Sequence, residues 1–340
     1  HNPSDEFLSS LNTEFGIDIP DGAGLDAVES VRKMNEGEAG VFISMGGNFL
    51  SAMSDTKATA EGLQKCSLTV QISTKPNRSH LVTGMTGIIL PCLGRTELDN
   101  TGGKTQFVTV ENSMGVVHKS IGKRRPASNH LLSECAIVAG IAIAIEEKME
   151  SSGIPWKNLV SDYDNIRDCI ERTIPGFEEY NRRSRVDGGF YLPNPPRDKR
   201  VFQTKNALAN IITHKLQPIL AGKNEFVMMT IRSHDQYNTT IYSTSDRYRG
   251  ISNGRRVVMM SLEDMETRGW EEFQSVCITS HFEGNEISSD GWKILEYDIP
   301  VGNVATYFPE SNVLIPLESV ADSSNTPTSK SVVVSIEPMN

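Results

Sequence analysis

The sequence lacks the spacings that mark a metal centre and the long apolar run that marks a membrane span. Its five cysteines form no CxxC pair, and its seven histidines show neither HxH nor HExxH spacing. A metal ion held by this chain alone is therefore not expected. The longest apolar run, AIVAGIAIAI at 136–145, is about half of the roughly 20 residues that a bilayer-crossing helix needs. We predict a buried helix there.

An excess of positive charge is also missing. The net charge of -10 repels nucleic acid and anionic membrane surfaces at long range, so neither is expected as a partner. The unpaired cysteines, most of them among apolar residues, resemble free core thiols and indicate a reducing, cytoplasmic compartment. The chain begins HNPSDEF, with neither an initiating Met nor a signal pattern, so we expect an excised piece of a longer protein.

What is present is an ordinary globular composition over 340 residues, enough for two domains. Residues 22–150 alternate apolar strands with helical patterns, which predicts an α/β fold with a parallel sheet. In the clearest unit, the strand AGVFIS stops at Gly46-Gly47 and SLTVQIS starts the next strand. Ser54 or Asp55 can cap the helix between them, which should end near Lys65.

Further along, TGIILP at 86–91 predicts another strand, and the Gly-rich stretch after it predicts a hairpin. We expect one helix of about twenty residues, capped by Ser128 or Asn129 and ending near Gly153. Residues 154–180 look helical until Pro175 stops them. The Gly-, Pro- and Arg-rich stretch that follows indicates a connection between domains or an arm laid across a surface.

From residue 222 onward, short strands and turns alternate, which is typical of a closed β-barrel. We therefore expect an α/β domain over 1–180, a linker over 181–221 and a barrel domain over 222–340. The six predicted strands are EFVMMTI, RRVVMM, SVCITSHF, WKILEYDI, NVLIPL and SVVVSIE.

Polar residues follow the first two strands of the sheet. Glycines at the carboxyl edge of a parallel sheet let backbone approach a phosphate or sugar, and small hydroxyl and amide groups can bind a ribose or base. GGN lacks the GxGxxG spacing, so a plain tight turn explains it equally well. The candidates are Gly46, Gly47 and Asn48 after the first strand, and Gln71, Ser73 and Thr74 at the end of the next.

The strongest local feature is MMTIRSHDQYNTTIY at 228–242, an apolar strand that runs directly into polar residues. A guanidinium, amides and backbone N–H groups there could surround a charged ligand. Loop hydrogen bonding is the plainer explanation. A hydrolytic His234–Asp235 pair is a third, but no Ser or Cys nucleophile motif accompanies it, so we assign no catalytic residue. The polar run comprises Arg232, Ser233, His234, Asp235, Gln236, Tyr237 and Asn238.

Taken in order, these pieces resemble the C-terminal half of molybdopterin oxidoreductase catalytic (alpha) subunits, the family of formate dehydrogenases, dissimilatory nitrate reductases and dimethyl sulfoxide reductase. The resemblance covers nearly the whole chain and is nearest to the formate-dehydrogenase-like branch. It implies a Rossmann-like parallel sheet region followed by a C-terminal six-stranded β-barrel of the double-psi type. The matching stretches run from VFISMGGNFLSAMSDT, through MMTIRSHDQYNTTIYSTSDRYRGI and NVATYFPESNVLIP, to SNTPTSKSVVVSIEP.

The resemblance also implies roles for the candidates. Gly46 to Asn48 and Gln71 to Thr74 would help to hold a guanosine diphosphate tail, and Thr230 and Arg232 would form a binding strand end. The loop from Ser233 to Asn238 would touch the pterin and its phosphates, while Asn312, Asn325 and Lys330 would close over a second pterin guanine dinucleotide. TGIILP departs from the family's ADVVLP, and the loop before it is longer, so contacts from Lys75 to Met85 are not carried over.

The implied cofactor is bis(molybdopterin guanine dinucleotide) with molybdenum. The family's iron–sulfur cysteines and its metal ligand belong to the N-terminal half, which would be the partner of this piece. We expect a small-molecule substrate for the parent enzyme, and no activity and no bound cofactor in this piece alone. The alternative is a free-standing nucleotide- or pterin-binding module, or a maturation protein that holds the cofactor without turnover.

Overall fold

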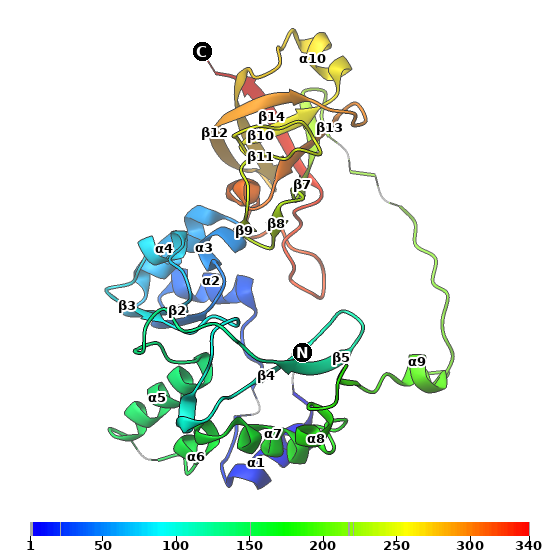
Figure 1. Cartoon of the computed structure of the whole chain (residues 1–340). Coiled ribbons are helices and arrows are strands. Elements are labelled where there is room, and N and C mark those ends of the chain that lie inside the picture. The colour runs from blue at the N-terminus through cyan, green and yellow to red at the C-terminus, as the bar shows by residue number, and fades with distance from the viewer. Residues whose placement is uncertain (1–2, 21, 150, 217, 220, 340) are drawn as a thin grey trace. The chain divides into compact units, whose positions relative to one another are not determined.

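The computed structural model describes residues 3–20, 22–149, 151–216, 218–219 and 221–339. The chain forms two compact units, coloured along the sequence in Figure 1. One unit comprises His1–Gly24 and Leu90–Lys215, and the other Leu25–Ile89 and Leu216–Asn340. This division differs from the contiguous one expected from the sequence, because residues 25–89 group with the C-terminal region. Within the expected linker 181–221, residues 217 and 220 lie outside the described part.

The second unit begins with a three-stranded sheet in the order β1-β2-β3. The strands are β1 (Val41–Met45), β2 (Leu68–Ser73) and β3 (Thr86–Pro91). β1 and β2 are parallel, with Met45 opposite Ile72. The helix between them, α4 (Thr56–Lys65), begins where a carboxylate satisfies a free backbone donor: Asp55 Oδ1 accepts from Ala58 N at 3.0 Å. The expected parallel crossover is confirmed.

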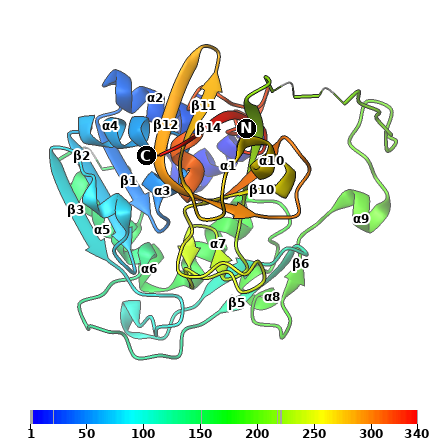
Figure 2. The same cartoon turned by 90° about the horizontal axis from the view of Figure 1, so that it is seen from above.

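Helices α4 and α2 (Ala27–Glu36) lie against this sheet (Figures 1 and 2). Val31 and Met34 of α2 and Leu63 of α4 form one buried cluster, and Phe42 of β1 packs against it. Two short helices follow the strand ends: α3 (Phe49–Ala52) after β1 and the 3-10 helix η1 (Arg78–Leu81) after β2.

The C-terminal part of the same unit is a barrel whose six strands pair in the closed order β10-β12-β11-β14-β7-β13. It closes because β10 pairs with β12 on one side and with β13 on the other. The strands are β7 (Glu225–Ile231), β10 (Val257–Met260), β11 (Ser275–Phe282), β12 (Asn285–Glu296), β13 (Asn303–Tyr307) and β14 (Val332–Pro338). Helix α10 (Leu262–Arg268) follows β10, and a small hairpin of β8 (Gln236–Tyr237) and β9 (Thr240–Ile241) follows β7.

Alternating side chains fill the barrel, as the period of two along a strand requires. In β11, Val276 and Ile278 are fully buried, and they meet Phe226, Met228 and Trp292 from neighbouring strands. Burying each such side chain stabilises the fold by about 1.5–3 kcal/mol. The period-two pattern read from the sequence therefore corresponds to a real core.

The prediction of a strand at NVLIPL (312–317) is wrong. Its first residues belong to the 3-10 helix η3 (Glu310–Leu314), and the strand is β13, just before it. Leu314 and Ile315 are fully buried in the barrel core, so the apolar run fills the core rather than extending a pleated strand. Pro309 and Pro316 flank the run, and proline cannot donate to a strand ladder.

The first unit is mainly helical. The expected hairpin is confirmed as β4 (Val108–Glu111) and β5 (Val116–Ser120), to which β6 (Phe190–Tyr191) adds a third strand. As expected, α7 ends before Pro175. The helices are α1 (Asp5–Phe15), α5 (Glu134–Glu146), α6 (Trp156–Ser161), α7 (Tyr163–Thr173), α8 (Tyr180–Arg183) and α9 (Pro195–Lys199), with the 3-10 helix η2 (Thr101–Gly103).

The prediction for this helix is wrong in its start, its end and its burial: α5 has 13 residues and ends at Glu146 rather than near Gly153. The cap is Ser133, whose Oγ accepts from Ala136 N at 3.1 Å, rather than Ser128 or Asn129. Only Ile137 and Ala139 of this helix are buried. The helix is apolar on all of its sides, but other elements cover only one face of it. Across the described ranges, no helix has the length and apolar character to cross a membrane.

Within the second unit, a buried asparagine joins the barrel to the sheet region. Asn312 on η3 is 4% exposed, and its Nδ2 donates to Ser51 O at 2.8 Å and to Ala52 O at 3.0 Å. Beside it, Asp55 N donates to Ile315 O at 2.8 Å. These bonds attach α3 and the start of α4 to η3.

We predict that Asn312→Ala lowers the free energy of unfolding by about 2 kcal/mol, because it leaves two buried carbonyls without their donor. Urea unfolding measures this. Asn285→Ala, at the exposed first residue of β12, serves as the control and should change stability by less than about 0.5 kcal/mol. Equal effects of the two substitutions would contradict the bridging role of Asn312.

Candidate functional site

The loop after β1 leaves its backbone open to solvent. Gly46 and Gly47 adopt φ values of 65° and 70°, which side-chain-bearing residues rarely adopt, and nothing lies within 4 Å of where a Cβ would stand on either. Gly46 N donates to Ile72 O at 2.8 Å. Because β1 and β2 are parallel, this loop lies beside Ser73 and Thr74 at one edge of the sheet. Close approach of a ligand to this backbone meets no side chain of the loop itself.

Some of the expected ligand groups at this edge instead bond within the fold. Gln71 is buried, and its Nε2 donates to Ser79 O at 2.7 Å. Ser73 Oγ donates to Lys75 O at 2.8 Å, and Asn48 Oδ1 accepts from Ser79 Oγ at 3.0 Å. Gln71 in particular orders the loop after β2 rather than facing outward.

A histidine in that loop has an unused hydrogen-bond donor. His80 Nδ1 accepts from Asn77 N at 3.0 Å, which places the proton of the neutral ring on Nε2. Nε2 is buried and has no partner among the described residues. Asn77 Nδ2 meanwhile donates to Gly47 O at 2.7 Å, so this loop is tied to the glycines after β1. His80 is not among the predicted site residues, because the stretch from Lys75 to Met85 departs from the family pattern.

The end of β7 carries two cations. β7 and β13 are parallel, with Tyr307 opposite Ile231, so Arg232 and Phe308 emerge at the same barrel edge. The guanidinium of Arg232 lies 5.3 Å from the centre of the Phe308 ring. Lys330 Nζ donates to the carbonyl of Thr230 and lies 3.3 Å from its Oγ1.

The charge of Lys330 is not balanced by a carboxylate. Burial, and then the positive charge of Arg232, lower the pKa of Lys330. Among the described residues, neither cation has a carboxylate within ion-pair distance. Two neighbouring cations without counterions attract an anion.

Behind these cations, the loop after β7 is held by an arginine that the sequence analysis read only as the start of a strand. Arg255 is 7% exposed. Its Nη1 donates to Ser233 Oγ at 2.6 Å, and its Nη2 to Gln236 Oε1 and Phe308 O, both at 2.9 Å. Its Nε donates to Glu310 Oε1 at 2.7 Å. The consecutive Arg255-Arg256 before a strand was the only sequence signal, since alternation directs one of the two inward.

A second buried charge orders the following segment. Asp246 is 3% exposed and accepts from Tyr307 Oη at 2.8 Å and from Arg249 Nη1 at 2.6 Å. Burial by itself would raise the pKa of Asp246, but these two bonds outweigh it and lower the pKa. His234 stacks on Tyr248, with ring centres 4.0 Å apart, and its Nδ1 lies 3.7 Å from Asp246 Oδ1. The charged partner of His234 is therefore Asp246 rather than Asp235.

The predicted site residues late in the chain have different hydrogen-bond partners and lie in different places. Asn312 lies inside the fold, and Asn325, at a φ of 51°, donates to Asp26 Oδ2 at 2.9 Å. Lys330 joins Arg232 at the end of β7. Tyr237 is exposed on β8. The structure thus brings together Thr230, Arg232, Ser233, Gln236 and Lys330, and separates Asn312 from them.

The two strand-end regions meet at one junction of the unit. α3, which follows Gly46 to Asn48, packs on η3, which follows the end of β13. The loops after β1 and β2 and the loops after β7 and β13 therefore border the same α3–η3 contact.

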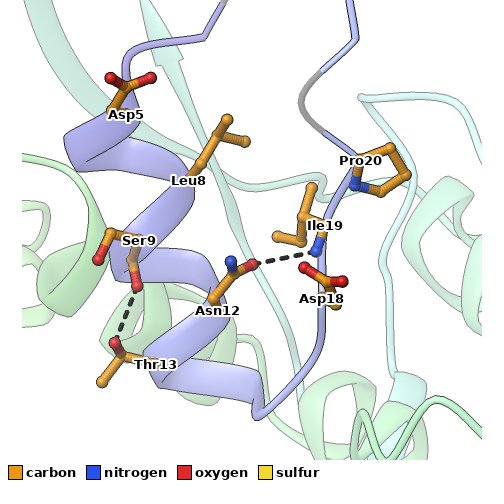
Figure 3. Close-up of a pocket in the computed structure, with 8 residues that line it drawn as sticks. All are labelled: Asp5, Leu8, Ser9, Asn12, Thr13, Asp18, Ile19 and Pro20. Atoms are coloured by element: carbon orange, nitrogen blue, oxygen red, sulfur yellow. Dashed lines mark hydrogen bonds between the residues drawn. The ribbon is translucent and has the colours of Figure 1, made fainter.

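The hollow drawn in Figure 3 is of a different kind. It lies in the first unit between α1 and the segment after it, where Asn12 Oδ1 accepts from Ile19 N at 3.2 Å. Its charged lining residues are Asp5 and Asp18. Two carboxylates without a cation do not suit an anionic ligand.

Comparisons with known proteins include the same part of the chain. Residues 226–333, which include both cations and Arg255, match the family model of the molydopterin dinucleotide binding domain. The chain is 45% identical to an uncharacterized oxidoreductase of Mycobacterium tuberculosis, over 98% of this chain and 43% of that protein. Residues 226–333 belong to the molydopterin dinucleotide binding domain family.

Two further comparisons concern a second curated relative and a solved structure. The chain is 41% identical to the protein YdeP of Escherichia coli, over 99% of this chain and 45% of that protein. Its fold resembles that of acetylene hydratase from Pelobacter acetylenicus, with a TM-score of 0.60 at 12% identity, over 98% of this chain and 50% of that one. The chain thus spans less than half of the length of these curated relatives.

The residues at the junction suit a molybdopterin dinucleotide. Arg232 and Lys330 offer unbalanced positive charge to a pyrophosphate, the open backbone at Gly46-Gly47 admits a close contact, and His80 Nε2 offers a buried donor. Of these groups, His80 Nε2 is buried without a hydrogen-bond partner in the described fold.

The Asp246 network gives a test in acid. The folded-state pKa of Asp246 is lowered. The charged carboxylate therefore stabilises the fold fully above the unfolded-state pKa of about 3.9, and this stabilisation is lost as the pH falls through the lower folded-state pKa. We predict that Asp246→Asn loses about 2–3 kcal/mol of stability at pH 7. The loss should shrink toward pH 3.

Urea unfolding of the wild type and the variant from pH 7 to pH 3 measures this dependence. Asp322→Asn, at an exposed position in the same unit, is the control and should follow the wild type at every pH. A loss for Asp246→Asn that stays constant over the whole range would contradict the role of the charge.

Proposed function

We propose that this chain supplies cofactor-binding surfaces of a molybdenum-dependent oxidoreductase of the formate-dehydrogenase-like branch. It would hold bis(molybdopterin guanine dinucleotide) for two-electron redox chemistry. The observation that carries the proposal is the pair of cations at the end of β7, Arg232 and Lys330, which have no carboxylate partner among the described residues. Both lie inside the region that matches the molydopterin dinucleotide binding domain.

In this proposal the phosphates contact Arg232 and Lys330, and the pterin edge contacts the loop from Ser233 to Asn238, where hydrogen-bonding groups of both kinds are available. Gly46-Gly47 and the exposed Thr74 contact the nucleotide end at the neighbouring sheet edge. When bound, the cofactor supplies the redox chemistry, and the chain binds and orients it.

The activity of a complete enzyme is part of the proposal. We propose an N-terminal partner region that brings the metal ligand and an iron–sulfur cluster, a small-molecule substrate, and a cytoplasmic location. We also assign the barrel to the double-psi type. Along the sequence we propose an α/β domain over 1–180, an arm over 181–221 and the barrel domain over 222–340, although residues 25–89 pack with the barrel's unit. The parallel pairs β7–β13 and β10–β12 within an otherwise antiparallel barrel support that type.

Cofactor retention tests the proposal. In the full-length protein, Arg232→Gln and Lys330→Gln should each lower the affinity for guanosine diphosphate about tenfold, because each removes one charge-assisted hydrogen-bond donor. Calorimetric titration measures the affinity, and mass spectrometry of small molecules released on denaturation measures the bound guanine and pterin.

The control is Lys293→Gln, which removes an exposed cation from β12 of the same barrel and should leave both measurements unchanged. Unchanged cofactor content in both site variants would reject the binding role of this edge. Cofactor retained by a wild type that carries out no redox turnover would favour a binding or maturation protein instead.

A further inference from the structure

The guanidinium of Arg255 connects three segments of the chain. Arg255 lies just before β10. Its guanidinium donates hydrogen bonds to Ser233 and Gln236 after β7, and to Phe308 and Glu310 after β13. Gln236 Nε2 also donates to Phe308 O at 2.8 Å, which closes the ring of contacts. A planar fork of donors satisfied in this way fixes the relative positions of its acceptors.

The charge of Arg255 is already balanced. Glu310 accepts from Nε at 2.7 Å and from Nη2 at 3.2 Å, as in a bidentate ion pair. Arg232 and Lys330, a few residues away along the same edge, have no such partner in the described chain. The edge therefore contains two kinds of cation, one neutralised and buried, and the other exposed and unbalanced.

The guanidinium of Arg255 also contacts an aromatic ring. Its Cζ lies 4.6 Å from the centre of the Tyr307 ring, and the Tyr307 hydroxyl donates to Asp246. The ring fixes the plane of the guanidinium while its edges donate to the loop. Since Arg255 is 7% exposed, its contacts lie within the protein.

We propose that Arg255 is a positioning residue that sets the loop from Ser233 to Gln236 in its ligand-binding conformation, whereas Arg232 and Lys330 supply the charge that attracts the ligand. The inference rests on the proposed function of this edge. Arg255 contributes geometry, because Glu310 cancels its charge. A lysine would keep the charge but has a single nitrogen, which cannot reach Ser233, Gln236 and Glu310 together.

The test uses the full-length protein with Arg255→Lys and Arg255→Gln. Arg256→Gln is a matched control, because this adjacent arginine is exposed and bonds Ser289 Oγ at 2.5 Å, beside Trp292. Guanosine diphosphate is titrated calorimetrically at several salt concentrations. Hydrogen exchange is measured at the amides of 233–238 and, for comparison, of β11.

We expect both Arg255 variants to bind guanosine diphosphate at least about tenfold more weakly, and Arg255→Lys, which retains the charge, to keep the salt dependence of the wild type. Exchange should rise at 233–238 while β11 stays protected. Arg256→Gln should match the wild type. Full affinity in Arg255→Lys would overturn the proposal, because it would show that the charge of residue 255 is sufficient and that the geometry of the guanidinium is not needed.

Glu310→Gln provides an independent test that leaves Arg255 in place. It retains an acceptor for the guanidinium but removes the balancing charge, so guanosine diphosphate binding should become more salt-dependent. An unchanged salt dependence would overturn the neutralisation by Glu310. If the wild type binds no guanosine diphosphate, the proposed function fails, and the positioning role is then decided by exchange alone: unchanged exchange at 233–238 overturns it.

Discussion

The parallel pairing of β7 with β13 is the constraint on which the rest of the site depends. An antiparallel pair would send the two chain directions to opposite ends of the barrel, whereas the parallel register of Ile231 with Tyr307 releases both chains at one edge. Arg232 and Phe308 are therefore neighbours, although many residues separate them along the chain. The closed strand order leaves no free edge at which this register could slip.

At that edge, the polar residues divide into those that the fold uses and those that it leaves free. Arg255, Gln236 and Asp246 are satisfied inside the protein, and each would destabilise it if it lost its partners. Arg232 and Lys330 stand outside this network. A rigid, internally satisfied layer behind a charged outer layer preorganises a binding site, since little ordering remains to be done when the ligand arrives.

The sequence was informative where a local pattern decides the structure. The crossover from β1 through α4 to β2, its Asp55 cap, the β4–β5 hairpin and all but one of the barrel strands follow from periodicity and turn residues. It misled at NVLIPL, where buried leucine and isoleucine fill the barrel core without forming a strand, since composition does not distinguish these two uses of an apolar run.

The candidate site divides in the same way. Proximity to a strand end correctly grouped Arg232 with its loop, because that information is local. It could not show that Gln71 and Asn312 bond distant backbone, nor that Arg255 reaches across from β10. Which carbonyl a buried side chain meets is decided by the tertiary fold, so polar residue type alone does not separate a ligand contact from a structural one.

The net charge of -10 is compatible with an anionic ligand once distance is considered. At physiological ionic strength, charges more than about 8 Å apart are largely screened, so a bound phosphate responds mainly to its nearest neighbours. Those neighbours are Arg232 and Lys330, while Glu310 and Asp246 are occupied by Arg255 and Arg249. The pairing of Glu310 and Asp246 with internal arginines leaves Arg232 and Lys330 unbalanced by these two carboxylates. The same pairing both orders the loop and preserves its attraction for the ligand.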